Sequence, residues 1–305
     1  MTRSQRPALV LGEALIDAVA KPTGTRITPG GSPMNVAVGL ARLGVPVTLA
    51  TQFGEDEYGQ VIAVHLAHSG VTVDRAEGRT SVARAELEPD GSARYDFDIV
   101  WDRTALLPTG AATPAVAHTG SISALLHPGS QAAAEMFRQL PASTVRSFDP
   151  NIRSALLDRE TALEKFDRLV GQAHVVKLSD EDADWLYPTA EPAEVLDTLL
   201  DSGVRLAAIT LGASGSIVAS RSARVNVAAP SVTVADTIGA GDAYMSGLLF
   251  ALLSAGGLPE EPLLDVPFLA RLGGTAAASA AVTVSRFGAD PPTSGELLDA
   301  MTGLR

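Results

Sequence analysis

Short apolar runs alternate with helical patterns along most of the 305-residue chain, and this alternation constrains its fold more than any other feature. Strands are predicted where brief apolar runs are bounded by polar or glycine positions. They are 8–16, 45–50, 115–119, 145–149, 174–179 and 206–211. Helical patterns lie between them, for example over 36–43, 58–68 and 131–140. This order predicts an α/β fold in which helices cover both faces of a mainly parallel central sheet.

Composition narrows the class of protein further. The length allows one or two domains, but no linker or internal repeat interrupts the chain, so we expect a single domain over 1–305. The sequence has no cysteine, which excludes disulfides and thiolate metal sites and fits a cytoplasmic location. The formal net charge of −12 disfavours nucleic acid and anionic membranes as partners. The longest apolar segment, 243–258, is shorter than the ~20 residues that a membrane span needs.

One stretch departs from the alternation of strands and helices. Between 82 and 99, apolar and polar residues alternate on either side of the turn-forming segment 89–92. This pattern predicts a two-stranded hairpin with one apolar face. An isolated hairpin is marginally stable, so we expect its apolar face to cover either the main core or a ligand.

The segment 236–242, Asp-Thr-Ile-Gly-Ala-Gly-Asp, carries the clearest functional signal. It follows a strand-like stretch at 231–235 and leads into an apolar helical pattern. A glycine turn at a helix start directs backbone N–H groups at a bound anion, and the helix dipole adds to the attraction. Asp242 is placed to remove a proton from a group that attacks such an anion. This arrangement suits phosphoryl transfer, whereas a plain turn capped by Asp242 is the structural alternative.

A second glycine-rich block covers 30–44. Gly30 and Gly31 allow the backbone to approach a ligand closely, and Asn35 offers a donor and an acceptor at a helix start. Asn35 as a simple helix cap is the alternative. Upstream, Asp17 closes the segment Gly-Glu-Ala-Leu-Ile-Asp, where a carboxylate can accept hydrogen bonds from the hydroxyls of a diol or end a strand.

Together these segments resemble those of the ribokinase-like, or PfkB-type, carbohydrate kinases. The segment 236–242 matches that family's second signature, D-T-x-G-A-G-D, at every specified position. The block 30–44 resembles the first signature in the form found in the fructokinase branch, and 12–17 and 148–153 resemble further segments of that branch. The resemblance implies a ribokinase-like three-layer α/β/α fold with a small β-sheet lid, formed by about 18–28 and 80–101.

The resemblance also implies roles for individual residues. Asp242 would deprotonate the sugar hydroxyl, and the amides of Gly239, Ala240 and Gly241 would stabilise the transferred phosphoryl group. The implied substrate-binding residues are Asp17, Gly30, Gly31, Asn35, Asn151 and Arg153. The implied nucleotide-binding residues are Lys177, Ser179, Thr210, Gly212, Gly215 and Gly288.

Ion sites are implied by the same resemblance. Asp236 and the carbonyl of Ile238 would hold a monovalent cation such as K⁺. Asp182 would orient Mg²⁺ through water, although the family has a glutamate at this position. Read from the residues alone, Ser179 and Asp182 form a capping box at a helix start.

The expected function is therefore transfer of the γ-phosphate of ATP to a sugar hydroxyl, with Mg²⁺ and K⁺ as candidate ions and fructose as the expected acceptor. The alternatives are 2-keto-3-deoxygluconate kinase, ribokinase and a nucleoside kinase, for which Tyr95 and Phe97 would stack on a base. A sugar- or nucleotide-sensing protein without turnover is a rival from another class, but such a protein has no use for Asp242. A dinucleotide-dependent oxidoreductase is disfavoured because no G-x-G-x-x-G follows the first strand. For this family a homodimer through the lid is also expected.

Overall fold

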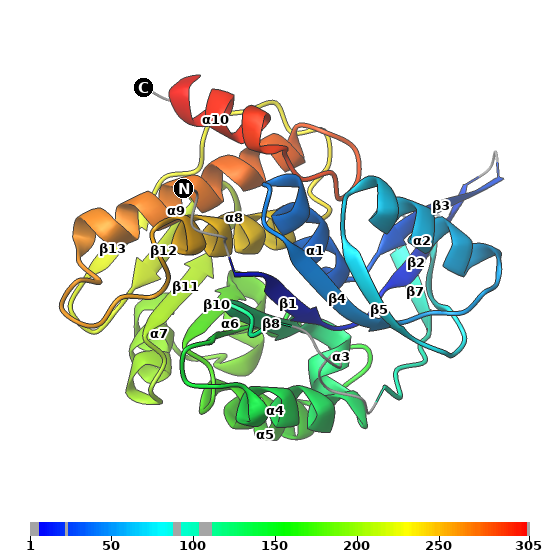
Figure 1. Ribbon diagram of the computed structural model, residues 1–305, viewed down its shortest axis with the longest axis horizontal. Coiled ribbons are helices and arrows are strands. Elements are labelled where there is room, and N and C mark those ends of the chain that lie inside the picture. The colour runs from blue at the N-terminus through cyan, green and yellow to red at the C-terminus, as the bar shows by residue number, and fades with distance from the viewer. Residues whose placement is uncertain (1–5, 22–23, 88–92, 104–111, 304–305) are drawn as a thin grey trace.

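The computed structural model describes residues 6–21, 24–87, 93–103 and 112–303 (Figure 1). Within these residues nine strands form the main sheet, in the order β13-β12-β11-β10-β9-β8-β1-β4-β5. Their bounds are β1 Ala8–Leu11, β4 Val47–Gln52, β5 Thr72–Ala76, β8 Val116–Gly120, β9 Val145–Asp149, β10 Val175–Ser179, β11 Leu206–Thr210, β12 Ser216–Ala219 and β13 Arg224–Val227. Every neighbouring pair from β5 to β11 is parallel, and β12 and β13 add an antiparallel edge. The predicted mainly parallel sheet is confirmed.

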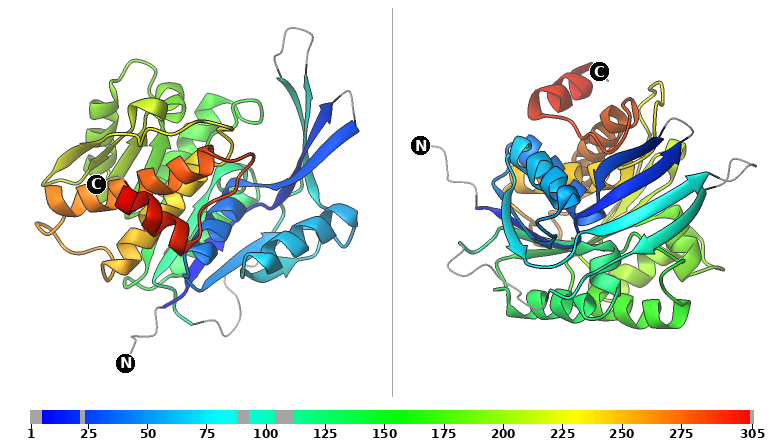
Figure 2. Two further views of the ribbon diagram at one scale, coloured as in Figure 1. Left: turned by 90° about the horizontal axis from the view of Figure 1, so that it is seen from above. Right: turned by 90° about the vertical axis from the view of Figure 1, so that its right-hand side faces the viewer.

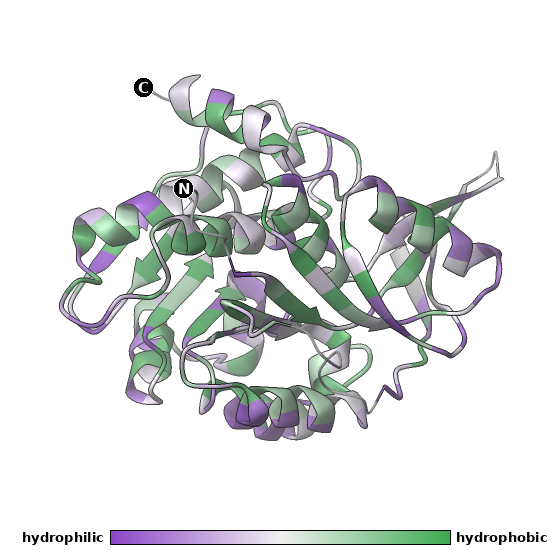
Figure 3. Cartoon of the chain, in the orientation of Figure 1, coloured by the Kyte–Doolittle hydropathy of each residue, from purple (hydrophilic) through white to green (hydrophobic). Residues whose placement is uncertain are grey.

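Helices cover both faces of this sheet, as the alternating pattern predicts (Figure 1). One face carries α1 Ser32–Arg42, α2 Glu57–His68, α8 Ala240–Ser254 and α9 Val266–Val284, with α10 Ser294–Gly303 packed against α9. The other carries α3 Ser121–Leu125, α4 Gly129–Gln139, α5 Arg159–Val170, α6 Asp180–Leu186 and α7 Pro192–Asp201. The strands are largely apolar, whereas α4 and α5 turn polar surfaces outward (Figure 3).

The main sheet separates two hydrophobic cores, one on each of its faces. In β1, Ala8 and Val10 join the core beneath α1 and α8, whereas Leu9 and Leu11 join the core on the opposite face. Successive side chains of a strand point to opposite faces, so this division follows from the backbone geometry. Both faces of β1 are therefore buried, which explains its uninterrupted apolar sequence.

A smaller sheet of four strands projects from the main body (Figure 2). Within the described residues it consists of β2 Leu15–Lys21, β3 Gly24–Gly30, β6 Ser81–Leu87 and β7 Ala93–Asp98, in the order β3-β2-β6-β7. The β2–β3 and β6–β7 pairs are antiparallel, and β2 runs parallel to β6. Its strands lie close to the predicted lid segments 18–28 and 80–101, but β2 starts at Leu15, three residues before the first predicted segment.

The base of the predicted hairpin covers the main body. Ala83 and the half-buried Phe97 pack with Leu15 and with Ile122 of α3. Of the two alternatives for the apolar face, contact with the core therefore holds at this end of the hairpin. The predicted turn 89–92 and the side chain of Tyr95 lie outside the described residues.

Two predicted strands are corrected by the structure. The run 8–16 is not one strand, because β1 ends at Leu11 and residues from Leu15 onward belong to the smaller sheet. Residues 12–14 between them belong to neither strand, and a Cβ on Gly12 would overlap the ring of Pro33. The stretch 231–235 forms no strand. Its last residue instead donates a hydrogen bond to Val284 O (2.8 Å), at the end of α9.

Candidate active site

The two glycine-rich segments meet at the carboxylate of Asp242, in the first turn of α8. Ser32 Oγ donates to Asp242 Oδ1 (2.6 Å), and Asn35 Nδ2 donates to Asp242 Oδ2 (2.8 Å). Asp242 is only 7% exposed, so these hydrogen bonds fix its orientation in a shielded site. A carboxylate offers about four lone-pair positions, so each oxygen can still accept a hydrogen bond from a substrate hydroxyl.

Backbone geometry at Gly31 places the start of α1 against this carboxylate. Gly31 caps the helix with φ +110°, and a Cβ there would lie 2.6 Å from the carbonyl oxygen of Glu13. Only glycine combines this left-handed conformation with so close a backbone approach. Ser32 and Asn35 consequently both reach Asp242 from the first turn of α1.

The glycine turn before α8 is equally constrained. Gly239 is the helix N-cap with φ +77°, and a Cβ on it would lie 2.6 Å from Ala289 Cβ. Ala240 and Gly241 form the first helical positions, where backbone N–H groups lack partners within the helix. The expected anion-binding turn and the expected base are therefore adjacent at one helix start.

A buried ion pair lies beneath this turn. Lys177 Nζ is 3.0 Å from Asp149 Oδ2, and it is also 3.0 Å from the position that a Cβ on Gly241 would occupy. Burial raises the pKa of Asp149 to about 6, although Lys177 opposes the shift. Burial alone would lower the pKa of Lys177, but Asp149, Asp182 and Asp242 outweigh it, and the pKa is raised.

Several expected sugar-binding residues are linked to one another and to Asp242 by contacts and charge. A Cβ on Gly30 would overlap the carboxylate of Asp17, so Asp17 packs directly on the Gly30 backbone. Burial raises the pKa of Asp17 to about 6, with an opposing contribution from Arg153 and a further increase from Asp242. Arg153 Nη1 donates to Asn151 Oδ1 (2.7 Å), and Asn151 has φ +37°. Charges on Asp17, Arg153 and Asp242 therefore interact.

The expected nucleotide-binding residues lie mainly at the carboxyl ends of β10 and β11. Ser179 and Thr210 are register partners there. Gly212 (φ +53°) and Gly215 (φ +94°) form the tight turn after Thr210, and a Cβ on Gly215 would overlap Val227 O. Ligands of open parallel sheets bind beyond the carboxyl ends of the strands, so this turn is in the expected place. Lys177 differs, because it is buried beneath the glycine turn.

Asp236 joins the glycine turn to the loop after α9. Its Oδ1 accepts from Ile238 N (3.1 Å), and its Oδ2 accepts from Gly288 N (2.9 Å). Gly288 has φ +77°. The carboxylate of Asp236 thus links Ile238, the other expected ligand of a monovalent cation, to Gly288, an expected nucleotide-binding residue.

Asp182 has a structural role that its sequence context predicts. It forms the capping box of α6: Asp182 N donates to Ser179 Oγ (3.0 Å), and Ser179 N donates to Asp182 Oδ2 (3.1 Å). Asp182 Oδ1 accepts from Ile152 N (2.8 Å). Across the described parts of the chain, no group of three or more His, Asp or Glu side chains is arranged to hold a metal ion.

Three further residues of this region escaped residue-by-residue prediction: Glu13, Ser32 and Asp149. Glu13 is buried, its Oε2 accepts from Ser123 N (2.9 Å), and burial raises its pKa. All three lie inside segments that the sequence comparison had already marked, at 12–17, 30–44 and 148–153. The position of these residues inside the three segments was therefore the signal available in the sequence. Their contact partners are seen only in the folded structure.

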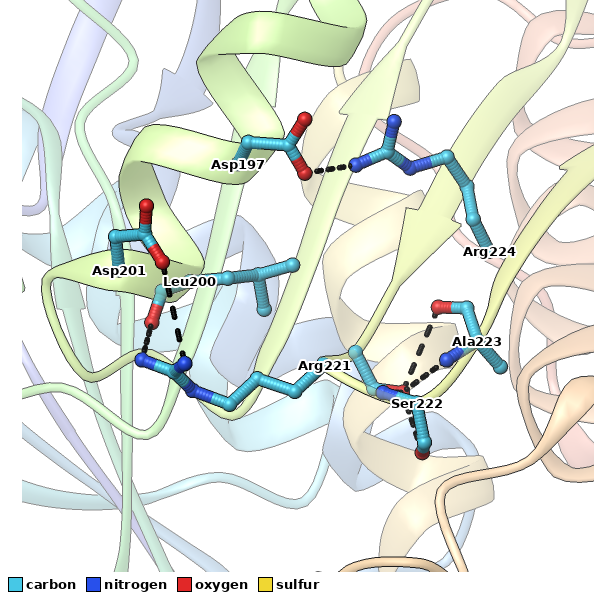
Figure 4. A pocket seen from close by; sticks show the side chains of 8 residues that line it. Asp197, Leu200, Asp201, Arg221, Ser222, Ala223 and Arg224 are labelled. Atoms are coloured by element: carbon cyan, nitrogen blue, oxygen red, sulfur yellow. Dashed lines mark hydrogen bonds and ion pairs between the residues drawn. The ribbon is translucent and has the colours of Figure 1, made fainter.

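A polar hollow of about 480 Å³ lies elsewhere, between α7 and the β12–β13 turn (Figure 4). Its arginines already face acids: Arg224 pairs with Asp197, and Arg221 pairs with Asp201. The hollow contains none of the residues singled out by the sequence.

No helix among the described residues is both long and apolar enough to cross a membrane.

An acid at a glycine-capped helix start, at the carboxyl edge of a parallel sheet, suits a protein of the phosphoryl-transfer class. Residues 6–294 match the family model described as pfkB family carbohydrate kinase. The chain therefore belongs to the pfkB family of carbohydrate kinases. A fructokinase from Oryza sativa subsp. japonica is 32% identical over an alignment of 315 positions, gaps included, which covers 95% of this chain and 96% of that protein.

Solved structures show the same similarity over the whole fold. A fructokinase from Xylella fastidiosa with bound ATP has a TM-score of 0.84 at 27% identity, covering 98% of this chain and 99% of that chain. A fructokinase from Vibrio cholerae O395, bound to fructose, ADP and calcium ion, has a TM-score of 0.83 at 25% identity, covering 98% of this chain and 100% of that chain. The ribokinase-like fold is confirmed.

Proposed function

We propose that this protein is an ATP-dependent fructokinase. The observation that carries the proposal is the carboxylate of Asp242, held by Ser32 and Asn35 beside the glycine turn that starts α8. The fructokinases among its relatives and structural neighbours support fructose as the acceptor. A sensing protein without turnover would not need an acid fixed at this position.

On the acceptor side, the sugar would lie between Asp17, Asn35 and the Gly30–Gly31 turn, with Asn151 and Arg153 nearby. Asp242 would accept the proton of the attacking hydroxyl, a general-base role worth typically ~10²–10⁴-fold in rate. The hydrogen bonds from Ser32 and Asn35 orient Asp242 before the substrate arrives. Such preorganisation lowers the barrier because little rearrangement remains for the reaction itself.

On the donor side, ATP would lie across the turn formed by Thr210, Gly212 and Gly215, with Ser179 and Gly288 flanking it. The N–H groups of the Gly239–Gly241 turn would stabilise charge that develops on the transferred phosphoryl group. Phosphoryl transfer depends mainly on such positioning and charge stabilisation. Lys177 would contribute a positive charge from below the turn.

Mg²⁺ and K⁺ are part of the proposal. Mg²⁺ commonly keeps several waters and binds one or two carboxylates together with substrate phosphates. Asp182 fits a contact through water, because each of its oxygens accepts one backbone N–H and can accept another hydrogen bond. When bound, Mg²⁺ would neutralise phosphate charge. Asp236 and the carbonyl of Ile238 would hold K⁺.

The smaller sheet would serve as a lid over the sugar within a single domain spanning 1–305. Closure would exclude water, which otherwise competes with the sugar as phosphoryl acceptor. We also infer a cytoplasmic location and a homodimer that contacts through this sheet. Size-exclusion chromatography with light scattering tests the dimer, since a monomer at micromolar concentration would contradict it.

A coupled assay of ADP release tests the proposed function. Fructose, ribose, 2-keto-3-deoxygluconate, glucose and adenosine are compared as acceptors, each with and without K⁺ and Mg²⁺. We expect the highest kcat/KM with fructose. A higher value with another acceptor would reassign the substrate within the family, and no acceptor-dependent ADP release would contradict a kinase.

A further inference from the structure

A row of polar side chains interrupts the apolar face of the central strands beneath α1 and α8. On β10, Val175 belongs to that core, so Lys177, two positions later, points to the same face. β9 is aligned so that Ser147 pairs with Val175, which places Asp149 beside Lys177. The residues of this row are His118, Ser147, Asp149 and Lys177, and each is buried.

Within this row, Asp149 and Lys177 are tied to each other. Their side chains are 0% and 4% exposed, and Lys177 Nζ donates to Asp149 Oδ2 (3.0 Å). A buried ammonium is costly unless a counterion and hydrogen bonds compensate for its lost hydration. The other oxygen, Asp149 Oδ1, is buried without a hydrogen-bond partner in the described structure. Among the described residues, the hydrogen-bond partner of the Asp149 carboxylate is therefore Lys177.

The ammonium also faces the glycine turn. It lies 3.0 Å from the position of a Cβ on Gly241, so a residue larger than glycine would press on it. An ammonium has three N–H donors, and the bond to Asp149 uses one of them. The remaining donors are available to an anion held at the turn, where the start of α8 already favours negative charge.

Charged and titratable groups from four elements surround Lys177: His118 from β8, Asp149 from β9, Asp182 from α6 and Asp242 from α8. The three carboxylates raise the pKa of Lys177 against the effect of burial. Burial and, secondarily, Lys177 lower the pKa of His118 to about 3, so this imidazole is neutral near pH 7. The ammonium is the cation of this buried group.

Resting on the proposed kinase function, we propose that Asp149 is a positioning residue that holds the Lys177 ammonium beneath Gly241. In this position the buried charge faces the phosphoryl group in the turn. Asp149 itself contacts neither sugar nor nucleotide and acts only through Lys177. The charge is fixed before the reaction, so it stabilises developing negative charge without reorganisation.

Four proteins test this inference: the full-length wild type, Asp149→Asn, Lys177→Met and the double variant. Far-UV circular dichroism checks folding, and fructose-dependent ADP release gives kcat and both KM values. We expect each single variant to lose about tenfold or more in kcat, as for other groups that stabilise transition-state charge. The fructose KM should change less than about threefold, and the double variant should match Lys177→Met. Asp197→Asn, which breaks a surface pair with Arg224, serves as the charge-matched control and should keep wild-type kinetics.

The outcomes separate the inference from the proposed function. An inactive wild type would overturn the kinase proposal itself and this inference with it. An active wild type with normal kcat in Asp149→Asn would overturn the inference alone, as would a double variant about tenfold slower than Lys177→Met. If Asp149→Asn does not fold, Asp149→Ser takes its place, and the same two outcomes decide: a normal kcat in the single variant, or a double variant slower than Lys177→Met, would overturn the inference.

Discussion

Ser32 Oγ donates a 2.6 Å hydrogen bond to Asp242 Oδ1, which connects residues that are 210 positions apart in the sequence. The bond links the first turn of α1 to the first turn of α8, and both residues are buried. It therefore sets the orientation of the proposed base through a residue that the sequence signatures do not single out.

We predict that Ser32→Ala lowers kcat by about tenfold with little change in KM for the sugar. A hydrogen bond to a charged group contributes roughly 1.5–3 kcal/mol, and its loss lets the Asp242 carboxylate leave the productive orientation. Steady-state kinetics measure the effect. Ser202→Ala, the same change at an exposed position after α7, is the control, and equal kcat in both variants would argue against the orienting role.

Asp17 predicts a pH dependence of sugar binding. Because its folded-state pKa is raised to about 6, the carboxyl is largely protonated at pH 5 and ionised at pH 7. The ionised form accepts sugar hydroxyls better, so the fructose KM should fall about tenfold between these pH values, in proportion to the ionised fraction. In Asp17→Asn the fructose KM should be higher and independent of pH. A fall of the same size in that variant would assign the titration to another group.

The same pKa shift gives a prediction for stability. A raised folded-state pKa stabilises the fold below the ordinary pKa of 3.8, and this contribution is lost as pH rises through about 6. Asp17→Asn should therefore gain stability relative to wild type between pH 4 and pH 7, by an amount on the order of 1–3 kcal/mol. Urea unfolding of both proteins at several pH values measures it. A difference in stability that stays constant with pH would contradict the shift.

Gly239 tests the geometry of the anion-binding turn. Gly239→Ala places a Cβ in a left-handed conformation and 2.6 Å from Ala289 Cβ, so the turn must move. We expect at least about a tenfold loss in kcat and destabilisation on the order of 1–3 kcal/mol. Gly203→Ala is the matched control, since Gly203 has φ +102° but no atom near its missing Cβ. Gly203→Ala should lose some stability and keep its kcat.

A substitution at Asp182 distinguishes a role in capping α6 from a role in binding Mg²⁺ through water. Asp182→Asn keeps one side-chain oxygen for the backbone, so α6 should lose about 0.5–2 kcal/mol of cap stability. If Asp182 also orients Mg²⁺ through water, the KM for Mg²⁺–ATP should rise severalfold. Thermal unfolding and ATP kinetics measure the two effects. A loss of stability with unchanged nucleotide kinetics would leave Asp182 as a cap only.

Periodicity predicted the layers of the fold because strand and helix repeats differ and both faces of the central strands are buried. The predicted strands at 145–149 and 174–179 match β9 and β10 within one residue at each end. The run 8–16 was predicted as one strand because apolar character continues through Ala14 and Leu15, whereas residues 12–14 belong to neither β1 nor β2. A change from one sheet to another within an apolar run leaves no trace in local periodicity.

The candidate site was predictable where the chemistry lies within one segment. Asp242 and the Gly239–Gly241 turn are contiguous, so their spacing was informative. The Asp149–Lys177 pair joins two neighbouring strands, and only the register of β9 and β10 brings the partners together. Lys177 was consequently assigned to the nucleotide without its counterion. The stretch 231–235 is not a strand because its valines cover no core: Val232 and Val234 are exposed, and Ala235 N donates to the end of α9.

Asp242→Asn tests the central claim most directly. The substitution preserves volume and removes the basic carboxylate, so the account predicts normal folding and a fructose KM within a fewfold of wild type. It also predicts a kcat lower by ~10²–10⁴-fold. A kcat near that of the wild type in this variant would contradict the assignment of Asp242 as the base, and with it the proposed mechanism.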